Sequence, residues 1–492
     1  MRRNLPENCY SMMIAILKGI KSKTTFFTSL SVFFILIFLT SPNDTTGSQP
    51  ILTIEGTVTN IPPSLPNSIY LYSYYGNELT EEASSPVNEQ GVFRFEMKSI
   101  LPQGLYKIGL DQTNAASLVI SGEEFISVKA DYGELKNDTI AVTNSRENEA
   151  YRVLLDEWKR MGSKMVRLTV EKSQISTVDP FFVRKTETIE DNVRLIMQEH
   201  NVNLLSIKET YPGTFMSDVL VGLSRIPLRI DHPDLKDRYD NERAFMHDYF
   251  FEFIGFGEER IVFTPLLAKK YFTYLDQYTH HTTQGFKESV DFLLAKAEDN
   301  STVYEFTIQY LMDTFREKGL PKLAEYVLDA YEEGCHNPLS TKTADKIEKL
   351  KRLRVGQVAP EIVSENPDGK TIPLSSLIGK KVVMVYIWAS WCEGCEAENP
   401  HIVSLYNTFK ERGLDIYAVA LDKEREEWLR AIRKHKFTWT NVSDLREWES
   451  EAVETYQVNR TPTIYLLNRE GRIMAKNLRG RELEMKVTEL LK

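Results

Sequence analysis

Cysteine is scarce in this chain of 492 residues, and its four copies are unevenly placed. Cys9 and Cys335 stand alone, whereas Cys392 and Cys395 are separated by only two residues. A secreted scaffold held together by disulfides needs several spread pairs, so this composition excludes that class. A structural zinc site needs four ligands, and no second C-x-x-C accompanies this pair. The spacing therefore favours thiol chemistry over zinc, and a purely structural pair remains the alternative.

Positive charge is not in excess either. Lys and Arg number 60 and Asp and Glu number 70, which gives a net charge of −10 at neutral pH. A mildly acidic chain has no electrostatic reason to bind nucleic acid, so we expect no nucleic-acid partner. With 42% hydrophobic and 26% charged residues, the composition is that of a globular protein. At roughly 150 residues per domain, the length predicts about three domains.

Long apolar runs are also missing, apart from "FFTSLSVFFILIFL" at residues 26–39. This run is shorter than the ~20 residues that a full membrane span needs. The basic residues before it are Arg2, Arg3, Lys18, Lys21 and Lys23, and a polar stretch follows it. We expect residues 1–50 to be a signal peptide or a short N-terminal membrane anchor with a linker. The basic flank then places the rest of the chain in the periplasm or cell envelope. A buried core helix is the alternative.

Residues 51–145 are rich in β-forming side chains. Segments such as "ILTIEGTVTN", "NSIYLYSYYGNE" and "QGLYKIGL" carry Val, Ile, Tyr and Phe between Gly, Pro and Asn. This pattern predicts an all-β domain, a sandwich or small barrel of about seven or eight strands. It looks like the β-rich domain of unknown function that precedes redox domains in some exported bacterial proteins.

Residues 146–350 change to the helical period. "ENEAYRVLLDEWKRM" and "VYEFTIQYLMDTFREKG" place apolar residues at i, i+3, i+4 and i+7. "PKLAEYVLDAYEEG" begins with a proline, as many helices do. The pattern predicts a central, mostly α-helical segment.

Residues 351–492 alternate between strand and helix patterns. "VVMVYIWA" and "LDIYAVALD" read as buried strands, and "TPTIYLLN" pairs with "GRIMAKNLRG" around the turn "NREG". A C-x-x-C at the first strand-to-helix turn is the thioredoxin arrangement. The chain is thus predicted to be multidomain. An N-terminal all-β sandwich-like domain and a central helical segment precede a C-terminal α/β thioredoxin fold.

At that turn, Cys392 would stand at the start of a helix. Free N–H groups and the helix dipole stabilise a thiolate there and lower its pKa from ~8.5 toward neutrality. Cys392 is therefore predicted to attack, and Cys395, one turn along and more buried, to resolve the mixed disulfide. Glu393 opposes thiolate formation, although solvent screens an exposed charge. Gly394 permits close approach of a partner's backbone.

Three motifs within residues 355–492 carry a family resemblance: "GQVAPEI", "IWASWCEGCEAENP" and "VNRTPTIYLLNREGRI". They resemble the TlpA/ResA-like membrane-tethered thiol-disulfide oxidoreductases of the thioredoxin superfamily. The resemblance implies a redox-active disulfide between Cys392 and Cys395, with no metal and no other cofactor. It also implies a cis-proline at Pro462 that, with Thr461, faces the pair and guides the backbone of a partner.

The same resemblance assigns Glu398 as the acid beneath the cysteines, which gives or relays a proton to Cys395, and Pro400 as the proline that kinks the helix. Two positions depart from the pattern. The dipeptide between the cysteines is Glu-Gly and lacks the proline common there, and Tyr386 stands where thioredoxin has a buried aspartate. Glu398 would have to do the work of that aspartate; a solvated residue of the first helical turn is the alternative.

These expectations describe an exported thiol-disulfide oxidoreductase, acting as a reductant. Its partners would be other exported proteins bearing thiols or disulfides, and a membrane electron donor. Trp391 is a candidate for docking substrates, or packs on the surface, and Trp388 is expected in the core. One alternative is a thiol peroxidase, although Ala389 occupies the position where such enzymes carry Thr or Ser. The other is a partner-binding envelope protein whose thioredoxin domain senses redox state.

Overall fold

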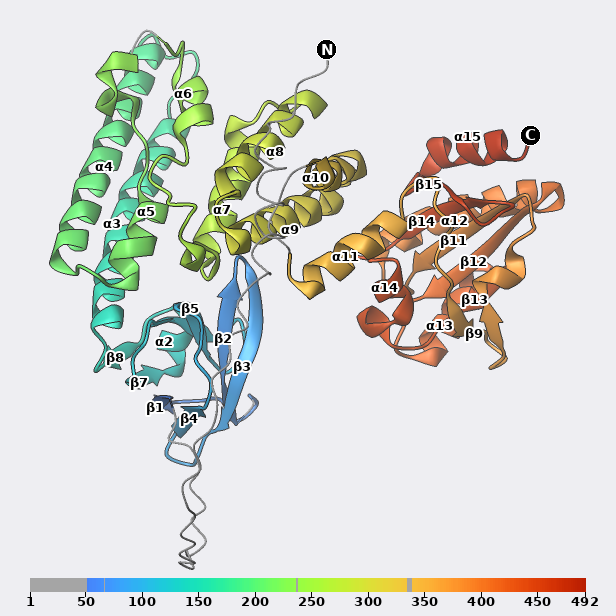
Figure 1. The fold of residues 1–492 in the computed structure, drawn as a ribbon, viewed down its shortest axis with the longest axis horizontal. Coiled ribbons are helices and arrows are strands. Elements are labelled where there is room, and N and C mark those ends of the chain that lie inside the picture. The colour runs from blue at the N-terminus through green and yellow to red at the C-terminus, as the bar shows by residue number, and fades with distance from the viewer. Residues whose placement is uncertain (1–50, 66, 236–237, 334–338) are drawn as a thin grey trace, which may run out of the picture. The chain divides into compact units, whose positions relative to one another are not determined.

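The computed structural model describes residues 51–65, 67–235, 238–333 and 339–492. The proposed export segment at residues 26–39 and the lone Cys335 lie outside these ranges. Within them we find no helix with the length and hydropathy needed to span a bilayer. The chain divides into two compact units: one combines the chain up to residue 306 with residues 333–337, and the other combines residues 307–332 with the chain from 338 onward (Figure 1).

The first unit begins with a β-sandwich, as predicted. Eight strands form two four-stranded sheets, in the orders β4-β1-β7-β8 and β3-β2-β5-β6. The first sheet contains β1 (Leu52–Thr59), β4 (Val92–Met97), β7 (Phe125–Asp131) and β8 (Ala141–Thr143). The second contains β2 (Ser68–Tyr75), β3 (Glu78–Pro86), β5 (Gly104–Gly109) and β6 (Ala115–Ile120).

Alternation of apolar and polar residues forms the core of this sandwich. In β4, Phe93, Phe95 and Met97 are buried and the residues between them are exposed, since successive side chains point to opposite faces. They join one hydrophobic cluster with Leu71 and Ile108 of the second sheet. The alternation in the sequence therefore gives each sheet one apolar face, and the two apolar faces pack against each other.

Helices make up the rest of the first unit, which confirms the helical prediction for this stretch. The short α2 (Tyr132–Lys136) belongs to the sandwich, and α3 (Arg146–Ser173) packs against α4 (Phe182–Thr210). The others are α5 (Val221–Ser224), α6 (Glu242–Tyr249), α7 (Pro265–Thr273), α8 (Thr283–Ala297) and the start of α9 (Ser301–Glu317). A side-chain cap marks the start of α3, where Ser145 accepts a hydrogen bond from Asn148 N–H at 3.1 Å.

The second unit contains a five-stranded sheet in the order β13-β12-β11-β14-β15. Its strands are β11 (Val382–Trp388), β12 (Leu414–Ala420), β13 (Thr440–Val442), β14 (Thr463–Asn468) and β15 (Ile473–Lys476). The central β11 runs parallel to β12 and antiparallel to β14. All seven residues of β11 are buried, as its continuous apolar run predicts. A separate two-stranded pair joins β9 (Val363–Glu365) to β10 (Thr371–Pro373).

Four helices complete the α/β part of this unit: α12 (Glu393–Phe409), α13 (Arg425–His435), α14 (Glu451–Thr455) and α15 (Gly480–Leu490). Helix α12 contacts both α13 and α15. The predicted pair β14–β15 forms around a turn in which the Asn468 carboxamide accepts the N–H of Glu470 and of Arg472. Gly471 supplies the positive φ of +75° that this turn requires. The thioredoxin-like prediction is confirmed for this part of the chain.

The end of α9, α10 (Pro321–Glu333) and α11 (Thr341–Arg352) belong to the same unit as the sheet. Lys476 on β15 pairs with Glu325 on α10 at 2.7 Å, and Lys349 on α11 pairs with Glu454 on α14 at 2.6 Å. Leu353, just after α11, is buried in the hydrophobic cluster of the sheet. These contacts join the last helices of the predicted helical segment to the thioredoxin-like fold.

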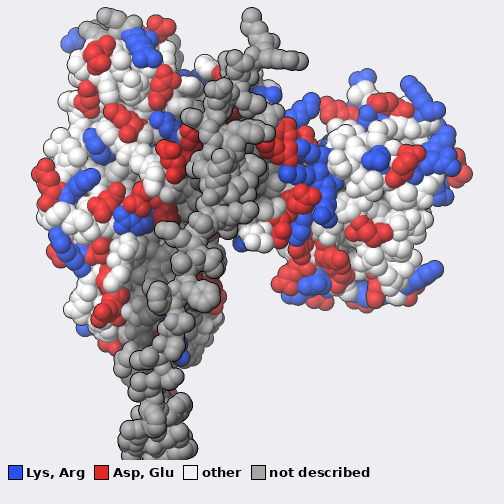
Figure 2. Space-filling view, viewed as in Figure 1, with Lys and Arg blue, Asp and Glu red and all other residues white. Residues whose placement is uncertain are grey.

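Charges of both signs are interspersed on the face shown in Figure 2. The basic residues at the end of α11 illustrate the mixing, because Lys351 pairs with Glu332 and Arg354 with Asp329, at 2.7 and 2.8 Å. Neighbouring charges of opposite sign neutralise each other locally.

Candidate active site

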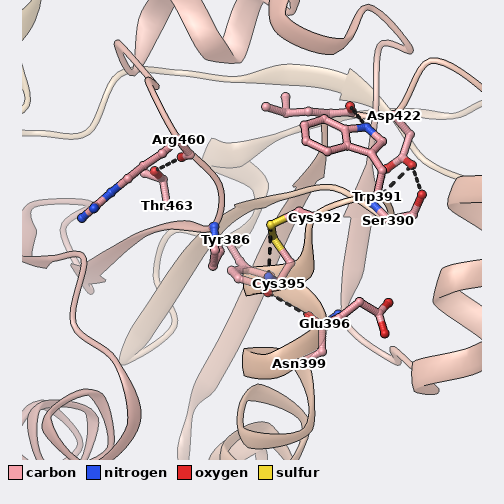
Figure 3. The surroundings of a disulfide bond; sticks show 12 residues. Tyr386, Ser390, Trp391, Cys392, Cys395, Glu396, Asn399, Asp422, Arg460 and Thr463 are labelled. Atoms are coloured by element: carbon pink, nitrogen blue, oxygen red, sulfur yellow. Dashed lines mark hydrogen bonds between the residues drawn. A yellow bond between two sulfur atoms is a disulfide. The ribbon is translucent and has the colours of Figure 1, made fainter. Parts of the chain in front are cut away.

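The two cysteines lie where β11 leads into α12. Cys392 is the N-cap of α12, and its Sγ accepts a hydrogen bond from the N–H of Cys395 at 3.1 Å. The sulfur atoms are joined in a disulfide with 5.2 Å between the Cα atoms (Figure 3). Cys392 is 7% exposed and Cys395 is fully buried. An N-cap sulfur that accepts a backbone N–H is placed to be stabilised as a thiolate.

The turn before Cys392 is held by a buried carboxylate, Asp422. It follows β12, whose carboxyl end lies beside that of β11. Asp422 accepts the N–H of Ser390 at 3.2 Å and also its hydroxyl. The indole N–H of Trp391 donates to Leu421 O at 3.2 Å. The segment after β12 therefore fixes the two residues that precede Cys392 (Figure 3).

This carboxylate makes stability depend on pH. Burial raises the pKa of Asp422, and its hydrogen bonds with Ser390 only partly oppose that shift. The folded state then keeps the proton to a higher pH than the unfolded chain. The contribution of Asp422 to stability is largest below the unfolded pKa of ~3.9 and is lost as the pH rises through the folded pKa.

We therefore expect Asp422→Asn to be more stable than the parent protein at neutral pH, because asparagine keeps an acceptor for Ser390 and cannot ionise. The difference should disappear below about pH 4. The urea midpoint of the second unit, monitored by hydrogen exchange at acid and at neutral pH, measures this difference in stability. Glu426→Gln, an exposed change in the first turn of α13, is the control. If the stability of Asp422→Asn relative to the parent falls between acid and neutral pH, the raised pKa of Asp422 is contradicted.

The two tryptophans of the motif have opposite environments. Trp388 is fully buried and stacks with Tyr386, which confirms that it belongs to the core. Trp391 is 45% exposed, and its ring lies 6.1 Å from that of Trp448, which is exposed to the same extent. An exposed aromatic pair beside a reactive sulfur offers a partner rigid contact area. The substrate-docking role of Trp391 remains a prediction.

A polar pair is buried where thioredoxin would carry an aspartate. The hydroxyl of Tyr386 on β11 donates to the side-chain oxygen of Asn399 on α12 at 2.8 Å, and both residues are buried. Burial raises the pKa of Tyr386, so this group stays neutral. The side-chain nitrogen of Asn399 has no hydrogen-bond partner among the described residues. Asn399 was not identified from the sequence, although it lies one turn beyond Cys395.

Glu398 is half-buried on α12, rather than fully enclosed beneath the cysteines. Its carboxylate accepts the N–H of Gly480, at the start of α15, at 3.2 Å. Beside it, the ring Nε2 of His401 lies 3.0 Å from Gly480 O. The side chain therefore faces the β15–α15 turn, and its proton-relay role remains a prediction.

The loop before β14 faces the cysteine pair. The Thr461–Pro462 peptide bond is cis, as the resemblance implies. A Cβ placed on Gly394 would lie 3.5 Å from the ring of Pro462 and 4.0 Å from the sulfur of Cys392. Gly394, Pro462 and Cys392 thus meet at one point. The guanidinium of Arg479 donates a hydrogen bond to Pro462 O and so fixes the position of this loop.

Within the described ranges, no three His, Cys, Asp or Glu side chains come close enough to bind a metal ion. The ring of His435 lies 2.8 Å from the Glu396 carboxylate. Pro400 lies inside α12, at the position where the resemblance implies a kink. The site as described contains a disulfide, a helix N-terminus, a cis-proline and the buried hydrogen bond between Tyr386 and Asn399.

Comparisons with known proteins agree with this geometry. Residues 355–476 match the model of the AhpC/TSA family. The chain is 35% identical over 127 residues to the thiol-disulfide oxidoreductase ResA of Oceanobacillus iheyensis, covering 25% of this chain and 64% of that protein. It is 30% identical over 132 residues to ResA of Halalkalibacterium halodurans, covering 27% of this chain and 73% of the relative.

Among solved structures, the thioredoxin domain of a thiol-disulfide oxidoreductase from Bacteroides vulgatus is 34% identical, with a TM-score of 0.27. The match covers 28% of this chain and 99% of that one. The residues that match the family model lie within the second unit. Through this C-terminal region, the chain belongs to the thioredoxin-like family of ResA-type thiol-disulfide oxidoreductases.

Proposed function

We propose that this protein exchanges disulfides with other proteins through Cys392 and Cys395. In the reducing direction, the Cys392 thiolate attacks one sulfur of a partner's disulfide, and the partner's other sulfur leaves as a thiolate that takes up a proton. The Cys395 thiol loses its proton and attacks the Cys392 sulfur. The second partner thiol is released, and the Cys392–Cys395 disulfide remains. Two electrons and two protons pass to the partner.

The observation that carries this proposal is the position of Cys392. It combines an N-cap sulfur, a neighbouring buried cysteine and a cis-proline loop at one point. A nucleophile needs activation and an oriented partner, and the helix N-terminus and the loop supply these two requirements. Cys395, being fully buried, is protected from attack by other thiols.

We also propose a setting for this chemistry. The basic and apolar pattern of residues 1–50 supports export, with anchoring through residues 26–39, and activity in the periplasm or cell envelope. The partners are then exported proteins with thiols or disulfides. The protein acts as a reductant that a membrane donor recharges, as the resemblance to ResA-type proteins suggests.

Turnover of a generic protein disulfide tests the activity. The full chain, kept reduced by dithiothreitol, should accelerate reduction of insulin disulfides. Equilibration with glutathione buffers then tests the direction. A midpoint near that of thioredoxin, about −270 mV, supports a reductant, whereas one near about −120 mV reverses the direction. Absence of turnover would contradict the enzymatic proposal.

Alkylation kinetics test which sulfur attacks. In the reduced protein at neutral pH, we expect iodoacetamide to label Cys392 well before Cys395, because Cys392 caps the helix and has an exposed edge, whereas Cys395 has none. Mass spectrometry of peptides reads the two sites separately, and urea-unfolded protein, in which both should react alike, is the control. Faster labelling of Cys395 would reverse the assignment.

One observation favours a partner-binding role as the second candidate. The connection between α3 and α4 exposes Val178 and Phe181, and the first turn of α4 exposes Val183, at 87%, 61% and 66% of their surface. Clustered exposed apolar residues often mark protein contacts. If the thioredoxin-like domain only senses redox state, the protein should capture a partner in one redox state and show no turnover with insulin.

A further inference from the structure

Arg479 lies between β15 and α15, outside the motifs that identify the redox site. It immediately precedes α15 and is half-buried. Its guanidinium donates to Pro462 O, the carbonyl of the cis-proline that faces the cysteines. A charged donor on a backbone carbonyl is a strong hydrogen bond and fixes the position of the loop.

The same turn is bound from the other side by the helix that carries the cysteines. Gly480, next to Arg479, donates its N–H to Glu398 at 3.2 Å, and its carbonyl lies 3.0 Å from the ring nitrogen of His401. Asn477, two residues earlier, receives the Ile464 N–H on its side chain at 3.2 Å. The turn therefore connects α12 with the cis-proline loop, two elements that must keep their spacing for exchange.

The electrostatic surroundings of Arg479 involve the active-site residues. Burial lowers the pKa of Arg479, whereas Glu398 on α12 and Tyr386 on β11 raise it, and Arg460 on the cis-proline loop lowers it. Glu398 is thus the charged partner that favours the guanidinium. Because Glu398 binds Gly480, the residue next to Arg479, the two charges lie at one turn and have opposite effects on the pKa of a nearby thiol.

We propose that Arg479 is a positioning residue for disulfide exchange, holding the Pro462 carbonyl opposite the cysteines and balancing the charge of Glu398. This rests on the proposed oxidoreductase function. The residue touches neither sulfur and acts through the loop and through Glu398. The guanidinium has a fixed fork of donors, so lysine replaces its charge but not its geometry.

Three variants of the full chain test the proposal. Arg479→Gln removes the charge, Arg479→Lys keeps it, and Arg481→Gln alters an exposed arginine in the first turn of the same helix. In Arg479→Gln we expect the thiolate absorbance of Cys392 to titrate about half to one pH unit higher, a roughly three- to tenfold loss of thiolate near neutral pH. Arg479→Lys should restore the titration of Cys392. KM for insulin should be raised in both Arg479 variants, because neither side chain has the fixed fork of donors. Arg481→Gln should match the parent.

A further variant separates charge from folding. Glu398→Gln should shift the Cys392 titration downward, and adding Arg479→Gln to it should return the curve toward that of the parent. If the Cys392 titration is unchanged in Arg479→Gln, the proposal is overturned. If Arg479→Gln does not fold, an unchanged Cys392 titration in Glu398→Gln overturns it instead. A titration shift in a protein that never reduces insulin contradicts the proposed function and supports only the charge effect of Arg479 on Cys392.

Discussion

Cys392→Ser should lower insulin reduction by at least about a thousandfold, because a serine hydroxyl cannot replace the thiolate that opens the disulfide. Cys392 is the N-cap of α12 and has an exposed edge, so a partner's sulfur can reach it. Serine is also a good helix cap, so this variant should fold as the parent does. The initial rate of insulin reduction with dithiothreitol as electron source measures the loss.

The matched variant Cys395→Ser gives a different defect. Attack by Cys392 still occurs, but resolution stops, so mixed disulfides with partners accumulate and become visible on non-reducing gels. Cys335→Ser controls for the loss of a thiol elsewhere in the chain. If Cys395→Ser loses its activity without trapping partners while Cys392→Ser traps them, the roles of the two sulfurs are reversed.

Trp388→Ala should destabilise the second unit by about 3 to 5 kcal/mol, as expected when a large aromatic side chain is removed from a packed core. Trp388 is fully buried, stacks with Tyr386 and lies edge-on to Phe437, with ring centroids 5.1 Å apart. Trp391→Ala is the matched control, since that ring is partly exposed and its loss should cost less than about 1 kcal/mol. The same control should raise KM for protein disulfides.

Hydrogen exchange of β11 peptides in increasing urea measures this difference within the second unit. Trp388→Phe refines the test. The indole N–H of Trp388 has no hydrogen-bond partner among the described residues, and a buried unsatisfied donor costs about 1 to 3 kcal/mol. Phenylalanine removes that donor and leaves a smaller cavity than alanine, so its net effect should be small. If Trp388→Ala and Trp391→Ala lower the free energy of unfolding equally, the placement of Trp388 in the core is contradicted.

The local parts of the fold and site could be predicted from the sequence because short-range patterns determine them. The alternation in β4, the apolar run of β11 and the turn around Gly471 each depend on neighbouring residues. The cysteine pair is likewise a local signal, since three residues place both sulfurs on one helical turn.

The supporting residues of the site were not predicted, because they come from separate elements. Asp422 reaches Ser390 only because β12 lies parallel to β11, and Arg479 reaches Pro462 only across the β14–β15 hairpin. A signal for Asp422 did exist. It is an acid directly after a buried strand, and the carboxyl ends of parallel strands meet at one edge. For Arg479, the sequence offers an ordinary basic residue near a helix start, which gives no indication of its partner.

The hydrogen bond between Tyr386 and Asn399 has a consequence for the proton balance of the redox couple. A buried aspartate gains or loses a proton within the working range of pH, but a tyrosine whose pKa lies above its usual ~10 does not. For a two-electron couple, each accompanying proton changes the midpoint potential by ~30 mV per pH unit. The phenol behind the disulfide therefore adds nothing to that slope. A plot of potential against pH then counts the protons of the two cysteines and of the carboxylates around them.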